Sequence, residues 1–121
     1  MAEAIGGTAF VFVDGVQYKL RGNFTVSPSS VERTMIAGQD GVHGFQELPR
    51  VPYIEGDIST THDLKLEALQ KQVNVTVIAQ LSNKIEYVLH GACTKGGFEN
   101  NTRDGQVRVR WEGEICEEIE L

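Results

Sequence analysis

Two short segments separated by Asp14-Gly15 constrain the fold of this chain more than any other feature of its sequence. Residues 8–13 and 16–21 are rich in apolar side chains at alternating positions. Asp-Gly is a pair favoured by a tight two-residue turn, because both central residues of that turn need positive φ. The pattern therefore predicts a β-hairpin and indicates a chain built mainly from β-strands.

The predicted hairpin has two unequal faces. A two-residue turn pairs Val13 with Val16, Val11 with Tyr18 and Ala9 with Leu20, and we expect all six of these apolar residues to point into the core. The opposite face carries Phe10 and Phe12 beside polar partners. A solvated face has little reason to hold two phenylalanines, so either a second layer of this chain or a neighbouring subunit must cover them.

The remaining segments also alternate, with glycine and proline between them. Residues 24–26, 31–36, 57–60, 73–80, 85–90, 106–112 and 114–121 are the predicted strands. Residues 64–72 form the one helical pattern, with Asp63 or Thr61 as its N-cap. Strand–helix–strand alternation is missing, which argues against a parallel sheet. We expect a mainly β fold, an antiparallel β-sandwich or partly closed barrel with one short α-helix packed on it.

Length and charge limit the possible functions. The chain has 121 residues, which predicts a single domain over residues 1–121. Its net charge of −6 argues against non-specific binding to nucleic acid or to an anionic membrane, because both rely on positive charge. No apolar run reaches 18 residues, and the N-terminus lacks the basic start of a secretory signal. We therefore expect an intracellular protein in which Cys93 and Cys116 are free thiols.

Residues 37–55 read AGQDGVHGFQELPRVPYIE, and we interpret them as a loop of 19 residues. Loops of that length are uncommon in compact domains unless they are functional or disordered. Its apolar content is too high for a solvated tether: Val42, Phe45, Leu48, Val51, Tyr53 and Ile54. The loop either folds over its own core or covers a neighbouring subunit, and we favour the neighbour.

Catalytic and metal-binding motifs give no support to an enzyme. Asp40, His43 and Glu47 cluster in the loop, but their spacing matches no zinc site, and Arg50 is a natural carboxylate partner nearby. The chain contains no nucleophile elbow, P-loop or dinucleotide fingerprint. The arginines at 103, 108 and 110 could contact phosphates, but alternating charge on a solvated strand is the simpler interpretation. We expect no catalytic residue, cofactor or metal.

Three stretches together resemble a known family. They are GQDGVHGFQE at 38–47, RVPYIEG at 50–56 and DGQVRVRWEG at 104–113. With the first hairpin, they make nearly the whole chain similar to the tail tube protein of Mu-like contractile-tailed phages and prophages. A turn at Ser82-Asn83-Lys84, where a glycine is more usual in that family, is the one departure.

The resemblance implies a structural virion protein, assembled in the host cytoplasm, that forms stacked hexameric rings. DNA would pass through the resulting inner tail tube without specific binding, and sheath, tape measure and baseplate or initiator proteins would be partners. The expected subunit contacts are Phe10, Phe12, Asp40, Gly41, Val42, His43, Gly44, Phe45, Glu47, Pro49, Arg50, Val51, Pro52 and Tyr53. A ring-forming secretion-tube protein of the haemolysin-coregulated type and a monomeric ligand-binding β barrel are the alternatives.

Overall fold

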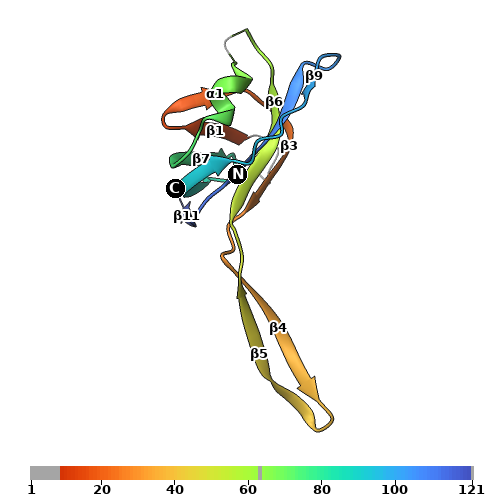
Figure 1. Ribbon diagram of the computed structural model, residues 1–121. Helices are drawn as coiled ribbons and strands as arrows, with labels where there is room; N and C mark the ends of the chain where they lie inside the picture. The colour runs from red at the N-terminus through yellow and green to blue at the C-terminus, as the bar shows by residue number, and fades with distance from the viewer. Residues whose placement is uncertain (1–8, 63, 121) are drawn as a thin grey trace.

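Figure 1 shows a computed structural model that describes residues 9–62 and 64–120. The strands are β1 (Ala9–Val13), β2 (Val16–Tyr18), β3 (Leu20–Ser27), β4 (Val31–Gly38), β5 (Gly41–Pro49), β6 (Tyr53–Ser59), β7 (Val75–Leu81), β8 (Ile85–Thr94), β9 (Asn100–Asn101), β10 (Gln106–Glu112) and β11 (Ile115–Glu120). The single described helix is α1 (Leu66–Gln70). All strand pairs are antiparallel, which confirms the predicted fold class, although the sheets do not close into a barrel.

The body of the protein consists of two sheets that share one strand. The first sheet has the order β2-β1-β7-β8, with β11 on the far edge of β8. The second contains β3, β6 and β10, with the short β9 beside β10. β8 joins them, because its last residues Cys93 and Thr94 pair with β10. Gly91 has φ +62, and a register shift in the β7–β8 ladder lies beside it, so a bulge bends β8 from one sheet into the other.

The core lies between the two sheets, and α1 supplies one residue to it. Its fully buried side chains come from both sheets and the helix: Val11, Val77, Ala79, Leu89 and Ala92, then Ile54, Ile58, Val107, Val109 and Trp111, and finally Leu69. The Trp111 indole N–H donates to Gln72 Oε1 at 3.0 Å, and Gln72 Nε2 donates to the Tyr18 hydroxyl at 3.0 Å. The largest core side chain therefore has its polar group satisfied.

The first hairpin is confirmed only in part. Asp14 and Gly15 have φ values of 48° and 86°, and Val13–Val16 and Val11–Tyr18 pair as predicted. The predicted pair of Ala9 with Leu20 is wrong, because the chain leaves the first sheet after Tyr18 and Leu20 pairs with Ile58 of β6. Leu20 is held there by close packing: a Cβ on Gly56 would lie 2.9 Å from its Cδ1 atom.

The helix is shorter than its sequence pattern. It begins after Lys65, which makes no side-chain cap hydrogen bond, and the predicted cap Thr61 instead accepts a backbone bond from Leu64. The other predicted cap, Asp63, lies outside the described residues. No helix in the described ranges 9–62 and 64–120 has the length and apolar character to cross a membrane.

The segment interpreted as a loop is the largest error of the sequence analysis. Residues 31–49 form a long antiparallel hairpin, β4–β5, which we call the arm. Figure 1 shows the arm projecting away from the two-sheet body. The predicted strand at 31–36 is confirmed and extends to Gly38, while the partner strand β5 was missed. A register shift between Ile36 and Ala37 and positive φ at Gly41 and Gly44 interrupt its alternation.

Candidate assembly surface

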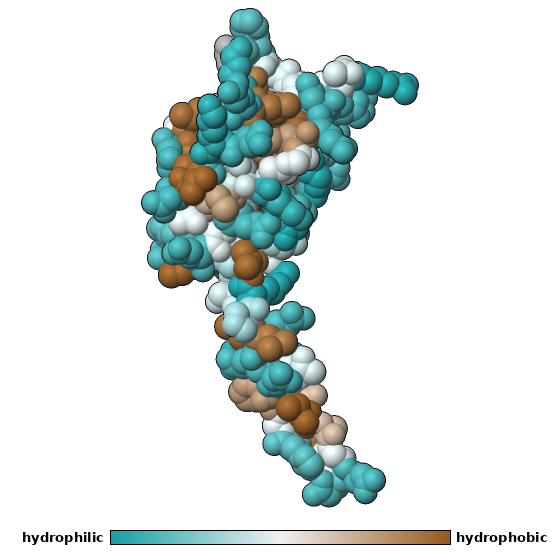
Figure 2. Space-filling view, in the orientation of Figure 1, coloured by the Kyte–Doolittle hydropathy of each residue, from teal (hydrophilic) through white to brown (hydrophobic). Residues whose placement is uncertain are grey.

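The arm carries apolar side chains that no other part of the described chain covers. Every residue from 31 to 51 is exposed except Gly44. The large apolar residues among them are Val31, Met35, Ile36, Val42, Phe45, Leu48 and Val51. Met35 is 64% exposed, Val42 67% and Phe45 56%. Figure 2 shows brown, apolar patches along the projecting arm. A clustered apolar surface of this kind marks an interaction site.

The register of the arm separates two faces. Val31 lies opposite Pro49, Met35 opposite Phe45, and Ala37 opposite Val42. Side chains alternate between the faces of a strand, so these pairs share one face, which we call the apolar arm face. Its members are Val31, Arg33, Met35, Ala37, Val42, Phe45, Glu47 and Pro49. The other face mixes polar residues and glycines with Ile36 and Leu48.

One ion pair interrupts the apolar arm face. Arg33 Nε lies 3.1 Å from Glu47 Oε1, and the Arg33 guanidinium lies 5.9 Å from the centre of the Phe45 ring. Both charged side chains are largely exposed, so the pair adds little to stability by itself. Arg50 was expected to be a carboxylate partner for this cluster, but the arginine that pairs with Glu47 is Arg33.

The tip of the arm is built around glycines. His43 Nε2 and Asp40 Oδ1 lie 2.5 Å apart, and this hydrogen bond lowers the pKa of the Asp40 carboxyl from its usual value. The His43 ring covers Gly38, where an added Cβ would lie 2.2 Å from the ring carbon Cε1. Glycine at position 38 therefore allows the imidazole to lie across the hairpin.

The neck of the arm separates it from the body. The Arg50 amide donates to the Ser30 carbonyl at 2.9 Å, just beyond the last residue pair of the arm. Pro52 is buried, so this predicted contact residue belongs to the core of the monomer and is not on the arm. Tyr53 is half-buried in β6, with the Arg110 guanidinium 3.7 Å from its ring centre. The arm thus includes the predicted contacts up to Pro49, with Arg50 and Val51 at its base.

Phe10 and Phe12 lie on the outer face of the first sheet, away from the core. Phe10 is 46% exposed and Phe12 is half-buried, and no second layer formed by the described residues covers them. Of the two explanations for this aromatic pair, cover by a layer of the described chain is therefore wrong. Cover by a neighbouring subunit remains to be tested.

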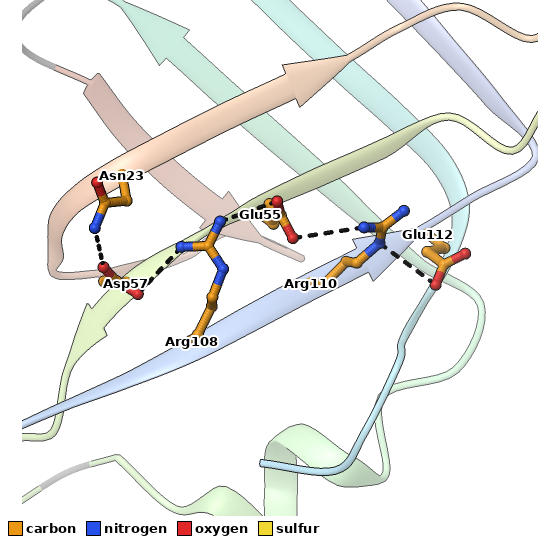
Figure 3. A network of polar contacts seen from close by, with 6 residues as sticks. All are labelled: Asn23, Glu55, Asp57, Arg108, Arg110 and Glu112. Carbon is orange, nitrogen blue, oxygen red and sulfur yellow. Dashed lines mark hydrogen bonds and ion pairs between the residues drawn. The ribbon is translucent and has the colours of Figure 1, made fainter. Parts of the chain in front are cut away.

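The outer face of the second sheet has a different character. Figure 3 shows its network of charges across β6 and β10, with Asn23 at one end. Arg108 Nη2 donates to Glu55 Oε1 at 2.9 Å, and Arg110 Nη1 lies 3.6 Å from Glu55 Oε2. Asp57 accepts hydrogen bonds from Arg108 Nη1 at 3.4 Å and from Asn23 Nδ2 at 2.8 Å. Arg108 and Arg110 are therefore engaged by carboxylates, which fits the interpretation of alternating charge on a strand.

The acidic and histidine residues of the arm form no catalytic or metal-binding group. Asp40 and His43 meet at the tip, but Glu47 pairs with Arg33 on the shaft. Within the ranges 9–62 and 64–120, no group of three or more histidine, cysteine or acidic side chains could hold a metal ion. Cys93 and Cys116 are free thiols as predicted, and Cys93 is exposed.

The total surface also indicates a missing partner. The chain exposes 8209 Å². Area scaling gives about 6,500 Å² for a compact monomer of this mass. The surplus is about twice the roughly 800 Å² that one partner buries in a standard protein–protein interface. An extended arm is an efficient way to present that much surface.

The sequence matches the phage tail tube protein family over residues 2–118. The chain belongs to this family. The match covers nearly all of the protein, including the arm, both sheets and the helix. No curated protein matches the sequence.

A solved relative has the same fold. A cryo-EM structure of the anti-feeding prophage cap, a tube-terminating cap, superposes with a TM-score of 0.67. The alignment covers 100% of this chain and 95% of the cap chain at 8% identity, so the likeness shows the fold. As a phage tail tube family member, the protein is a structural component of the virion and not an enzyme.

Proposed function

We propose that this protein polymerises as stacked hexameric rings that form the inner tail tube, through which phage DNA is delivered. The observation that carries the proposal is the arm, a hairpin of 19 residues with an exposed apolar face that none of the residues 9–62 and 64–120 covers. Covering that surface with another copy supplies the apolar burial that the monomer lacks. The proposed contact set comprises the arm, Arg50, Val51, Phe10 and Phe12.

The charged outer face of the second sheet suits the lumen of such a tube. Glu55, Asp57 and Glu112 outnumber Arg108 and Arg110, and each arginine faces at least one carboxylate. Phosphates would therefore find few free cations, and affinity for DNA grows with each phosphate that a protein neutralises. The face would let DNA slide, in keeping with the net charge of −6 per subunit.

The free edges of the sheets favour assembly as well. β3 ends the second sheet on one side, and an uncovered edge strand invites pairing with another chain. Pairing between subunits around a ring would remove such edges. A monomeric ligand-binding barrel has less support, because the sheets do not close into a barrel that could enclose a ligand.

A tube-terminating cap is the second candidate, and the structural likeness to the anti-feeding prophage cap favours it. A cap closes one end of a tube, so it would form a ring but would not stack on itself. A secretion-tube protein would stack in the same way as a tail tube. The identity of the sheath and baseplate partners would distinguish a secretion-tube protein from a tail tube protein.

The experiment is light scattering across a wide concentration range, with negative-stain imaging of the concentrated protein. Stacked tubes with six subunits per ring support the tail tube. Single rings at every concentration support the cap. A subunit that remains monomeric at high concentration and also after addition of its tail initiator complex would contradict both readings. The measurement with the initiator complex is needed because ordering the arm on assembly costs about 1–2 kcal/mol per residue, which slows spontaneous nucleation.

A further inference from the structure

The outer face of the first sheet is a second surface that carries apolar side chains: Phe10 and Ile119 are exposed, while Phe12, Ile78 and Val88 are half-buried. Phe12 lies opposite Ile78, Ile78 opposite Val88, and Val88 opposite Glu117. These residues form a continuous row across four strands, β1, β7, β8 and β11. Phe10 begins the next row, which ends at Ile119, 39% exposed. We call this surface, made of Phe10, Phe12, Ile78, Val88 and Ile119, the receiving face.

We propose that the receiving face of one copy binds the apolar arm face of another copy. This inference rests on the proposed function and names the partner surface that the arm takes. The arm cannot reach the receiving face of its own chain, because it projects away from the body beyond the neck (Figure 1). If copies exchange arms, the exposed arm face and the partly exposed receiving face are both covered.

The dimensions of the two surfaces agree. A strand rises about 3.4 Å per residue, so the eight residues of β4 extend roughly 24 Å. Strands in a sheet lie about 4.8 Å apart, so the five strands from β2 to β11 span roughly 19 Å. One hairpin can therefore lie across the first sheet from edge to edge.

Charge favours the same pairing. The receiving face carries Glu86 and Glu117 within its two rows, and His90 lies 3.6 Å from Glu117. The apolar arm face carries Arg33, whose Nε atom engages Glu47. The terminal nitrogens of the Arg33 guanidinium have no partner among the described contacts, so they can bind a carboxylate of the receiving face.

The size of the contact explains how it would be used. A single hairpin face covers only a few hundred Å² per partner, whereas stable complexes bury about 800 Å² on each side. One arm contact is therefore too small to hold a dimer. Repeated around a ring or between rings, the same contact becomes effectively intramolecular after the first one forms.

The test is disulfide mapping in assembled tubes. Subunits with Phe45→Cys and subunits with Ile78→Cys, both in a Cys93→Ser/Cys116→Ser background, are assembled together and oxidised. The proposal predicts a 45–78 dimer as the major product. The matched control replaces Ile78→Cys with Thr25→Cys, an exposed position of β3 whose partner Glu55 belongs to the charged face. Val42→Cys supplies a second arm position should Phe45→Cys prevent assembly.

Each other outcome overturns the proposal. A 45–25 dimer would put the arm on the charged face, and a 45–45 dimer would indicate arm–arm pairing. Intact tubes without a cross-link at either arm position would also contradict it. The rival occupant of the receiving face is the segment 1–8, and a 45–78 link that requires removal of that segment would support the rival. Wild-type protein that forms no tube under any condition would instead refute the proposed function.

A charge on the receiving face provides an independent measurement. Ile78→Glu should raise the concentration needed for assembly by at least roughly tenfold, because the contact would bury an unpaired carboxylate. Thr25→Glu is the control and should assemble as the wild type does. Equal assembly of both variants, with both folded, would contradict the proposal.

Discussion

The body and the arm use similar side chains in opposite ways. In the body, two sheets and a helix bury Trp111, Ile54, Leu89 and their neighbours, and the indole N–H has a partner in Gln72. In the arm, two strands present Met35, Val42 and Phe45 to solvent on an isolated hairpin. A two-stranded hairpin alone is only marginally stable, whereas three or more strands with a covered face can be stable on their own. The difference shows which part of the chain is complete and which part awaits a partner.

Removal of the arm should produce the largest effect. Replacing residues 31–49 with Asn-Gly joins Ser30 to Arg50, whose backbones already share a hydrogen bond, through a turn that suits a hairpin. The body should unfold in urea within about 0.5 kcal/mol of the wild type, because it makes its core without the arm. Polymerisation should be lost completely, as measured by sedimentation. A large loss of body stability would show that the two regions are not independent.

A matched pair of aromatic substitutions should separate the regions further. Trp111→Ala should lower the free energy of unfolding by about 3–5 kcal/mol, because it empties the centre of the core. Phe45→Asp should leave that free energy within about 0.5 kcal/mol and yet abolish tubes. Urea unfolding and negative stain measure both. Normal tubes from folded Phe45→Asp protein would exclude the arm as an interface.

Glycine substitutions should give a smaller effect on the body. A Cβ on Gly113 would lie 2.7 Å from Leu89 Cγ and 2.8 Å from the His90 carbonyl. Gly113→Ala should therefore cost about 1–3 kcal/mol of stability through overpacking. Gly22→Ala is the control, since nothing lies within 4 Å of a Cβ at that position. Equal thermal unfolding midpoints for Gly113→Ala and Gly22→Ala would mean that β10 and β11 relax around the added methyl group.

A substitution at the arm tip should have the smallest effect, and that effect should depend on pH. The hydrogen bond from His43 lowers the pKa of Asp40, so this contact stabilises the tip above the pKa of the unfolded chain. The contribution is lost as pH falls through the lowered value, below about pH 4. Carbon NMR of the Asp40 carboxyl should report a pKa below 3.8 that rises in His43→Ala. An unchanged titration in that variant would remove His43 as the cause.

Sequence reasoning succeeded where the signal was local. Asp14-Gly15 encodes its own turn, so the first hairpin could be predicted, but the departure of Leu20 to β6 depends on the gap that Gly56 leaves in another strand. Residues 37–49 of the arm were taken for a loop because both faces of the arm are exposed. Burial of one face normally creates the alternation that identifies a strand.

The candidate site was predicted from the amino-acid composition of its segment and not from the conformation that the segment adopts. The apolar content of residues 37–55 pointed to an interface, and the arm with its base presents these residues to solvent as far as Val51. Pro52 and Tyr53 share the same apolar character but belong to the body, because the chain re-enters the second sheet at that point. The sequence contains no marker of that boundary. The receiving face was missed beyond Phe10 and Phe12, since Ile78, Val88 and Ile119 join them only through the register of four strands.

Hydrogen exchange of the arm amides, before and after tube formation, tests the central claim most directly. An uncovered hairpin opens easily, so the amides of residues 31–49 should exchange rapidly in the monomer while those of β7, β8 and β10 are protected. On assembly, the arm amides should become as slow as those of the body. Equal protection of arm and body in the monomer, or an arm that stays unprotected in finished tubes, would contradict the account.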